Sequence, residues 1–262
     1  MKSNGRSLLP LLFAALTGTA LSFTALSFTA LAADTTLPAG EYLAKGGWGT
    51  LIIQKAANGQ QGFSLESLGA NGHSCSLDGS IRNGEANLHE DWQEGVCNVK
   101  FKWQDNGIEV SNEQNENCRG YCGARASFDG SYLKPAAGCS TEALRQTRNR
   151  FKKLYDSKDY AGAERLLAPV LSDCKTTLHW LDELATRNDL ALTQAKLGQG
   201  KACRSTLESM IEDAKRYSGP QDDNTAICDS GDRYLPPADC DGYLRQVRAA
   251  KTNLGWCERA GG

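Results

Sequence analysis

The stretch Cys118-Arg-Gly-Tyr-Cys-Gly-Ala-Arg-Ala-Ser-Phe-Asp-Gly-Ser-Tyr-Leu-Lys-Pro-Ala-Ala-Gly-Cys139 separates two halves of the chain with different hydrophobic periods. Before it, apolar and polar residues alternate, which is typical of half-buried strands. After it, apolar residues recur at helical spacing. We therefore predict an α+β chain of two domains. A small antiparallel β-barrel or sandwich is expected at 33–134, a hinge at 135–139 and a helical domain at 140–262.

The first half has the turns of a small antiparallel β domain. Asn-Gly pairs begin at Asn58, Asn71, Asn83 and Asn106, and this dipeptide favours the type I′ turn of a β-hairpin. The similar triplets at 40–42 and 130–132 predict that the first and last strands lie side by side, which would close the sheet. The residues expected to alternate inward are Phe63, Leu65, Cys75, Leu77, Cys97, Val99, Phe101, Trp103, Ile108, Val110, Ala124, Ala126 and Phe128.

The second half predicts five helices. Apolar residues at helical spacing place them near residues 144–154, 163–171, 178–197, 201–217 and 242–254. Gly198 is a stop signal for the third helix, and Pro169 is expected to kink or end the second.

The start of the chain predicts export. Lys2 and Arg6 precede an apolar run without charges at 8–31, and an Ala-x-Ala site follows at 30–32. These are the parts of a secretory signal peptide, which we place at 1–32. An uncleaved membrane anchor is the alternative, because the run is long enough to span a bilayer. After cleavage, the chain is expected in the periplasm or secreted, with no stable membrane insertion.

All ten cysteines follow the predicted signal peptide. An even number in an exported chain predicts disulfides, because such a chain meets an oxidising compartment. Zinc binding would need close Cys and His pairs, but the chain has no Cys-x-x-Cys and only three histidines. We therefore expect no metal and no other cofactor.

The expected neighbours suggest how the cysteines pair. In the first half, we predict one pair on neighbouring strands and one across a tight turn, for which a redox-active dithiol is the alternative. In the second half, two pairs join antiparallel helices and one brackets a polar loop. In that order, the pairs are Cys75–Cys97, Cys118–Cys122, Cys139–Cys174, Cys203–Cys257 and Cys228–Cys240. Four cysteines allow three connectivities and six allow fifteen, so other pairings stay open.

The charge balance and the motifs exclude several classes of function. From residue 34 to 134 the chain has 13 Asp and Glu against 8 Lys and Arg, a net charge of about −5, and the rest is nearly neutral. A nucleic-acid binder is not expected, since it would carry a basic excess. The chain has no Gly-x-Ser-x-Gly elbow, phosphate loop or dinucleotide motif, so we predict that it is not an enzyme.

Two loops of the first half are candidates for binding. The segment at 88–95 places an aromatic residue among acids, which is the composition of a binding hot spot. A tryptophan folded over the mouth of the barrel is the alternative. Glycoside hydrolysis by a pair of carboxylates among Glu90, Asp91 and Glu94 is another. Two further residues project from the turn after Cys118. The candidate binding residues are Glu90, Asp91, Trp92, Glu94, Arg119 and Tyr121.

Two segments of the helical half resemble the junction of a tetratricopeptide repeat. The segments are 151–171 and 188–208; they have a Tyr or a Leu-Gly before the turn, and Ala163 and Ala202 where helices would touch. They are offset by about forty residues, whereas the repeat usually has about 34. The resemblance implies a stack of helical hairpins with an interaction surface rather than an active site.

The first half resembles the small disulfide-bonded β domains of periplasmic lysozyme inhibitors in its hairpins, its last strand at 128–132 and its acidic balance. This resemblance implies an envelope protein that blocks a peptidoglycan-degrading enzyme. Our leading hypothesis is an exported, non-enzymatic inhibitor or immunity-type protein that binds a cationic, lysozyme-like partner. The alternative is a tetratricopeptide-like scaffold for an envelope complex.

Overall fold

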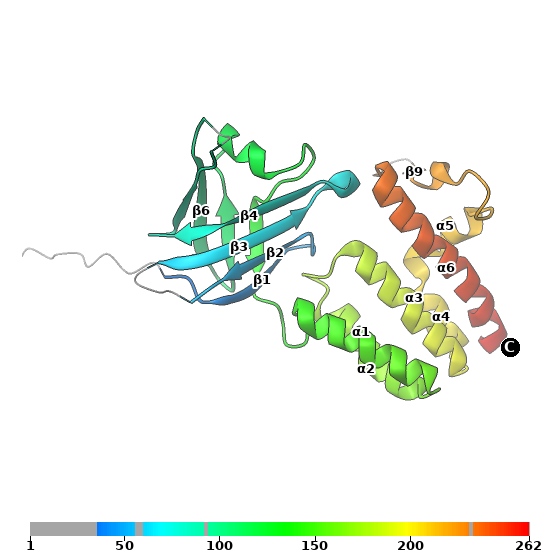
Figure 1. Cartoon of the computed structure of the whole chain (residues 1–262). Helices are drawn as coiled ribbons and strands as arrows, with labels where there is room; N and C mark the ends of the chain where they lie inside the picture. Colours follow the sequence, from blue (N-terminus) through cyan, green and yellow to red (C-terminus); the bar gives the residue numbers. More distant parts are fainter. Residues whose placement is uncertain (1–35, 56–59, 92–93, 231–232, 262) are drawn as a thin grey trace, which may run out of the picture. The chain divides into compact units, whose positions relative to one another are not determined.

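Figure 1 shows the computed structural model, which describes residues 36–55, 60–91, 94–230 and 233–261. The predicted signal peptide at 1–32, the predicted turn at Asn58 and the candidate residue Trp92 lie outside the described residues. Described strands of the main sheet lie between residues 40 and 133, and the first α-helix begins at residue 141. The expected α+β architecture of a β part followed by a helical part is confirmed.

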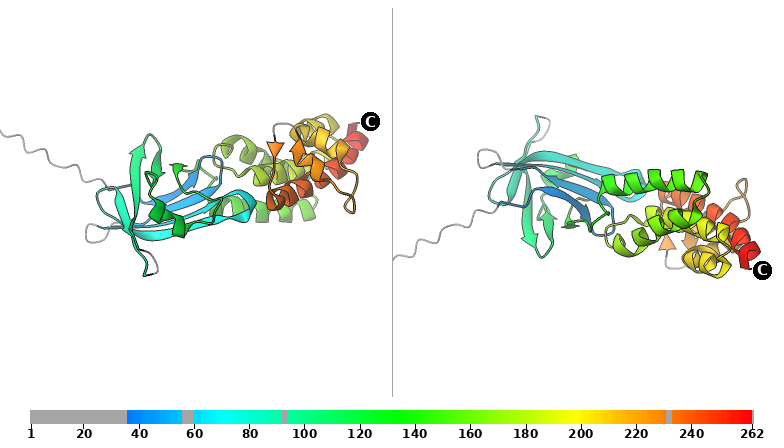
Figure 2. Two further views of the ribbon diagram at one scale, coloured as in Figure 1. Left: turned by 90° about the horizontal axis from the view of Figure 1, so that it is seen from above. Right: turned by 90° about the horizontal axis from the view of Figure 1, so that it is seen from below.

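The β part is one antiparallel sheet that curls into a nearly closed barrel (Figures 1 and 2). Its strands are β1 (Gly40–Ala44), β2 (Gly49–Ile53), β3 (Gln61–Leu68), β4 (Ser74–Ile81), β5 (Glu85–Leu88), β6 (Cys97–Gln104), β7 (Gly107–Ser111) and β8 (Gly130–Leu133). Their order in the sheet is β4-β3-β2-β1-β8-β7-β6-β5. The first and last strands pair as predicted, with Leu43 opposite Leu133. The two outer strands, β4 and β5, are not paired in the sheet, and Arg82 and Glu85 form an isolated bridge at their shared turn.

Alternation along the strands fills the barrel. In β6, Cys97, Val99 and Phe101 are buried, and the Phe101 ring lies 4.9 Å from that of Phe63. Trp103 continues this face and contacts the Tyr42 ring edge-on at 6.2 Å, but it is 41% exposed because it lies at the end of the strand. Burial of large aromatic rings is the main source of stability for a domain of this size.

Two of the Asn-Gly turns have the expected backbone, and one differs. Asn71 and Asn83 both have positive φ angles, of 61° and 53°, which the type I′ turn requires. At the third turn the positive angle belongs to Asp105, and Gly107 already pairs with Gln104 as the first residue of β7. The turn is therefore shifted one residue toward the N-terminus.

The expected strand at Ala124–Phe128 is not formed. The segment from η2 (Glu116–Tyr121), a 3₁₀ helix, to β8 is irregular; Ala124 is exposed, whereas Phe128 is fully buried. Tyr132 donates a hydrogen bond to the Phe128 carbonyl at 3.0 Å. This bond and the burial of Phe128 fix the segment without strand pairing, so an alternating pattern alone was misleading.

The helical part contains more breaks than the sequence predicts. Its α-helices are α1 (Thr141–Asp156), α2 (Tyr160–Asp173), α3 (Trp180–Lys196), α4 (Gly200–Thr206), α5 (Ile211–Arg216) and α6 (Pro237–Gly261). Ser140 and Asp159 cap α1 and α2 by accepting hydrogen bonds from backbone N–H groups, as N-cap residues do. The expected helix at 201–217 is divided into α4, the 3₁₀ turn η3 (Glu208–Met210) and α5. The second helix continues past Pro169 for four residues.

α3 is the central helix of this part, since it packs against α2, α4 and α6. The side-chain amide of Asn253, on α6, donates hydrogen bonds to two oxygens of the buried Asn188 of α3. It lies 3.0 Å from the backbone carbonyl of Asn188 and 3.1 Å from its side-chain oxygen. The Asn188 amide donates to the Gln246 carbonyl at 3.1 Å. Buried amides must be satisfied, so this pairing fixes the register of α6 on α3.

Five disulfides form, and three of the predicted pairs are confirmed. These are Cys139–Cys174, Cys203–Cys257 and Cys228–Cys240. The predicted pairs Cys75–Cys97 and Cys118–Cys122 are wrong, because the bonds are Cys75–Cys122 and Cys97–Cys118.

The pairing of these four cysteines follows from the order of the strands in the sheet. Cys75 lies on β4 and Cys97 on β6, and these strands are not neighbours in the sheet. The two cysteines of the 118–122 turn reach different strands instead, and η2 contacts both β4 and β6. The two bonds therefore hold η2 between β4 and β6, at the end of the barrel away from the turn that β4 and β5 share.

This connectivity is directly testable. Proteolysis of the oxidised protein without reduction, followed by mass spectrometry, is expected to give one linked peptide pair containing Cys75 and Cys122 and another containing Cys97 and Cys118. Cys75→Ser is expected to leave Cys122 as a thiol that reacts with an alkylating reagent. A linked pair of Cys75 and Cys97 would contradict the structure.

Candidate functional site

The two predicted binding loops lie together at one end of the barrel. The loop between β5 and β6 is joined to η2 by the Cys97–Cys118 disulfide. Asn115 donates hydrogen bonds to the Val96 carbonyl at 2.9 Å and to the Asn98 side chain at 3.0 Å, and Asn117 also donates to the Val96 carbonyl. We call this surface the end face; its residues are Glu90, Asp91, Glu94, Glu116, Arg119 and Tyr121.

The end face is acidic and firmly held. Glu90, Asp91, Glu94 and Glu116 are exposed carboxylates, whereas Arg119 is the one cation among the residues that define the face. Arg119 lies 3.6 Å from Glu116 in an exposed ion pair, so its positive charge is partly offset by a carboxylate of the same face. Such exposed pairs contribute little to stability, but four carboxylates on one surface create a negative potential that attracts cationic partners.

Tyr121 connects the two loops electrostatically. Burial raises the pKa of its hydroxyl, and the neighbouring carboxylates of Glu90 and Asp78 raise that pKa further. The ring also packs against the core of the barrel. Tyr121 therefore stays neutral at physiological pH and lies close to the carboxylate of Glu90, although the two residues are far apart in the sequence.

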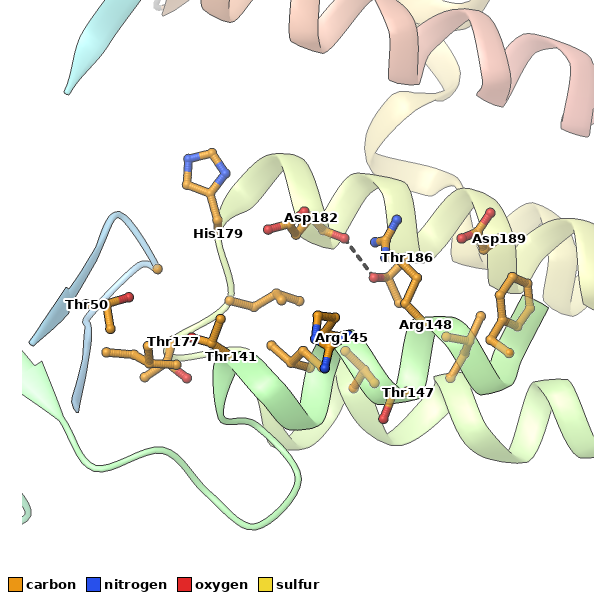
Figure 3. A pocket seen from close by; sticks show the side chains of 17 residues that line it. Thr50, Thr141, Arg145, Thr147, Arg148, Thr177, His179, Asp182, Thr186 and Asp189 are labelled. Atoms are coloured by element: carbon orange, nitrogen blue, oxygen red, sulfur yellow. Dashed lines mark hydrogen bonds between the residues drawn. The ribbon is translucent and has the colours of Figure 1, made fainter. Parts of the chain in front are cut away.

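A second site, which sequence reasoning missed, lies between α1 and α3. We call it the α1–α3 cleft; its volume is about 330 Å³. Figure 3 shows the labelled side chains of α1 and α3 on its two sides. Its apolar floor is formed by Leu144, Phe151, Leu167, Val170 and Leu178.

Helical spacing brings the polar side chains of the cleft together. On α1, Arg145 and Arg148 are three residues apart. On α3, Thr186 lies four residues after Asp182, and Asp189 three residues after Thr186. Residues at these spacings share one face of a helix. Arg145 forms two hydrogen bonds with Glu142, at 2.8 and 2.6 Å. The Thr186 hydroxyl donates to the Asp182 carbonyl at 2.7 Å.

Two ionisable groups of the cleft have shifted pKa values. Burial raises the pKa of the Asp189 carboxyl, and the positive charge of Arg148 opposes this shift. Burial lowers the pKa of His179, against the opposing charges of Asp182 and Asp239. Shifts of this kind are common where burial and charge meet at binding sites.

The turn between β1 and β2 closes one end of the cleft. The Gly46 N–H donates to the Thr176 carbonyl at 2.8 Å. Gly47 has a φ of +72°, and a Cβ there would lie 2.2 Å from the His179 backbone nitrogen. Only glycine fits this conformation and this close contact.

The cleft was missed because its charges look like solvated helix faces in the sequence. The signal that the sequence contains is a basic face on one helix, at Arg145 and Arg148, and an acidic face on another, at Asp182 and Asp189. Its meaning depends on α1 and α3 facing each other, which the spacing within each helix does not determine.

Comparison with known proteins provides no assignment: no family model, curated protein or solved structure matches the chain. In the part of the chain that the structure describes, no group of three or more His, Cys, Asp or Glu side chains is arranged to hold a metal ion. Helices long and apolar enough to cross a bilayer are also absent from that part.

Proposed function

We propose that the protein is an exported, non-enzymatic binding protein whose end face engages a cationic protein, with a lysozyme-like or other peptidoglycan-degrading enzyme as the first candidate partner. The observation that carries this proposal is the union of two separate loops in one acidic surface. In Figure 1, η2 is the green helical turn above β4 and β6. The periplasm, or the medium after secretion, is the proposed location.

The construction of the end face supports a role in recognition. Two disulfides and the hydrogen bonds of Asn115 hold η2 against the barrel. A surface held in place before binding loses less conformational entropy when a partner arrives. Val96 is 40% exposed beside the carboxylates, which provides apolar area within a charged surface.

The disulfides also bear on the compartment. Five disulfides indicate a protein that folds outside the cytoplasm, because the cytoplasm keeps thiols reduced. A protein of the bacterial envelope meets cationic cell-wall-degrading enzymes in that compartment, and an acidic surface would bind them fastest at low salt.

Inhibition assays test the proposal. Mature protein is titrated into lytic assays with a panel of cationic peptidoglycan-degrading enzymes. We expect inhibition of at least one enzyme, and we expect the variant E90Q/D91N/E94Q to raise the concentration needed by about tenfold, mainly through slower association. The loss is expected to be larger at low salt, because salt screens the same charges.

A charge-matched variant provides the control. D173N/E208Q/D241N removes three exposed carboxylates from the helical part and is expected to inhibit as the wild type does. Equal losses in both variants would show that only net charge matters, which would contradict a defined end face. Absence of inhibition across the panel would remove the inhibitor role.

A scaffold role in an envelope complex is the second candidate, and the α1–α3 cleft favours it. The helices α1 and α2 pack together, as do α3 and α4, and in a tetratricopeptide-like stack the first helix of each pair lines the binding groove. Partner capture that survives E90Q/D91N/E94Q but is lost when Arg145 and Arg148 are changed to Gln would favour this role.

A further inference from the structure

The two walls of the α1–α3 cleft carry opposite charges that the protein itself does not neutralise fully. Arg145 is paired with Glu142 at 2.6 Å. Among the described residues, by contrast, the Arg148 guanidinium has no hydrogen-bond or salt-bridge partner, and the Asp189 carboxylate accepts no hydrogen bond. The two groups interact across the cleft without forming a salt bridge of 4.0 Å or less.

The partly buried Asp189 carboxylate is the more unusual of these groups. Burying a charged oxygen without a donor is costly, and burial raises the pKa of this carboxyl. A ligand that brings a positively charged donor would relieve this cost. The pairing would also be stronger than at an open surface, because the cleft partly excludes water.

The rest of the cleft suits an apolar body of small size. Phe151, Leu167 and Leu178 are buried and line the cleft, and Thr147 and Thr177 add hydroxyl groups to the lining. A volume of about 330 Å³ is at the lower end of the range for small-molecule sites. A single amino acid or a dipeptide fits this size, whereas a long folded segment does not.

We propose that the α1–α3 cleft binds a zwitterionic amino acid or dipeptide with an apolar side chain. The carboxylate of the ligand pairs with Arg148, its ammonium group pairs with Asp189, and its side chain lies on Phe151 and Leu167. This site is separate from the end face, so the inference goes beyond the proposed inhibitor role and does not depend on it.

Calorimetric titration of the full mature protein tests the proposal. The probes are free phenylalanine, the dipeptide alanyl-phenylalanine, and the same dipeptide with an acetylated N-terminus or an amidated C-terminus. We expect saturable binding of the free amino acid or the dipeptide, and the stronger of the two identifies the ligand length. Removal of either terminal charge is expected to weaken binding by about tenfold or more, since each cap removes one charge-assisted interaction.

Variants connect each charge to its side chain. Arg148→Gln is expected to bind the free and the C-terminally amidated dipeptide with equal affinity. Asp189→Asn is expected to bind the free and the N-terminally acetylated dipeptide with equal affinity. Arg150→Gln, an exposed change on the same helix, and Asp241→Asn, an exposed change on α6, are expected to bind as the wild type does. Melting temperatures of all four variants show whether the fold is retained.

Three results would overturn the proposal. The first is the absence of saturable binding of either free ligand at concentrations up to about 10 mM. A dissociation constant above this limit means a binding free energy weaker than about 3 kcal/mol. The second is equal affinity for free and capped dipeptides, which would show adsorption by the apolar floor alone. The third is unchanged affinity for the free ligand in folded Arg148→Gln and Asp189→Asn, which would show that these charges do not contact it.

Discussion

Replacing both Cys203 and Cys257 with alanine is expected to lower the free energy of unfolding by about 4 kcal/mol. The disulfide joins residues 54 positions apart, so its loss restores a large amount of conformational freedom to the unfolded chain. It also holds α4, which has only seven residues, against α6. A helix of that length is not stable alone, so we expect α4 to loosen first.

Urea unfolding at neutral pH measures this effect, and another disulfide provides the comparison. The Cys228–Cys240 bond joins residues only 12 positions apart, so its removal by two alanines is expected to cost about 3 kcal/mol, less than the first pair. Cys203, Cys257, Cys228 and Cys240 are all buried, so both changes leave similar cavities. A larger loss from the 228–240 pair would contradict the loop-length argument.

The sequence predicts the β part well where short-range chemistry decides the structure. The positive φ angles of Asn71 and Asn83 follow from a dipeptide that tolerates them, and the burial of Val99 and Phe101 follows from strand alternation. The pairing of β1 with β8 is a long-range contact, yet the closure of the sheet gave a physical reason to expect it.

The disulfides of the first half show where such reasoning stops. Cys118 and Cys122 are close in sequence, which favoured a local bond. In a 3₁₀ turn, however, they reach different strands, Cys118 toward β6 and Cys122 toward β4. The direction of each side chain depends on where η2 crosses the barrel, and no spacing in the chain encodes that crossing.

The candidate sites divide in the same way. The end face could be predicted in part, because its loops have the unusual compositions that mark exposed recognition segments. Their union could not, since it depends on the Cys97–Cys118 bond. The α1–α3 cleft depends on how α1 packs relative to α3 and on the β1–β2 turn that closes one end. The positions of Arg148 and Asp189 in the sequence therefore do not show that they share a cleft.

A buried cluster around Asp213 holds the long loop between α5 and α6. The Asp213 carboxylate accepts hydrogen bonds from the Tyr243 hydroxyl, from Arg216 and, at 2.7 Å, from Arg233. Arg233 also donates to the Ile227 carbonyl at 2.7 Å and lies 4.6 Å from the centre of the Tyr243 ring. One carboxylate therefore links α5, the loop and α6.

Asp213→Ala is expected to lower the free energy of unfolding by about 3 kcal/mol at neutral pH. The change leaves the partly buried guanidinium of Arg233 without its counter-charge, which is the costly way to break such a pair. Glu212→Ala is the matched control, because this neighbouring carboxylate is exposed and its ion pair, among the described residues, is with the exposed Lys215. We expect the control to change stability little in the same urea titration.

The effect of Asp213→Ala should depend on pH in one direction. Burial acts to raise the pKa of the Asp213 carboxyl, but hydrogen bonds from Tyr243, Arg216 and Arg233 outweigh burial and lower that pKa in the folded state. Because the pKa of this carboxyl is lower in the folded state than in the unfolded chain, its ionisation stabilises the fold at pH values above the unfolded pKa of about 3.9. This stabilisation is lost as the pH falls through the folded pKa. The difference between wild type and variant is therefore expected to be constant from about pH 7 to 5 and to shrink below about pH 4. A difference that grows on acidification would contradict the assigned role of the carboxylate, because it would mean that the protonated acid holds the loop.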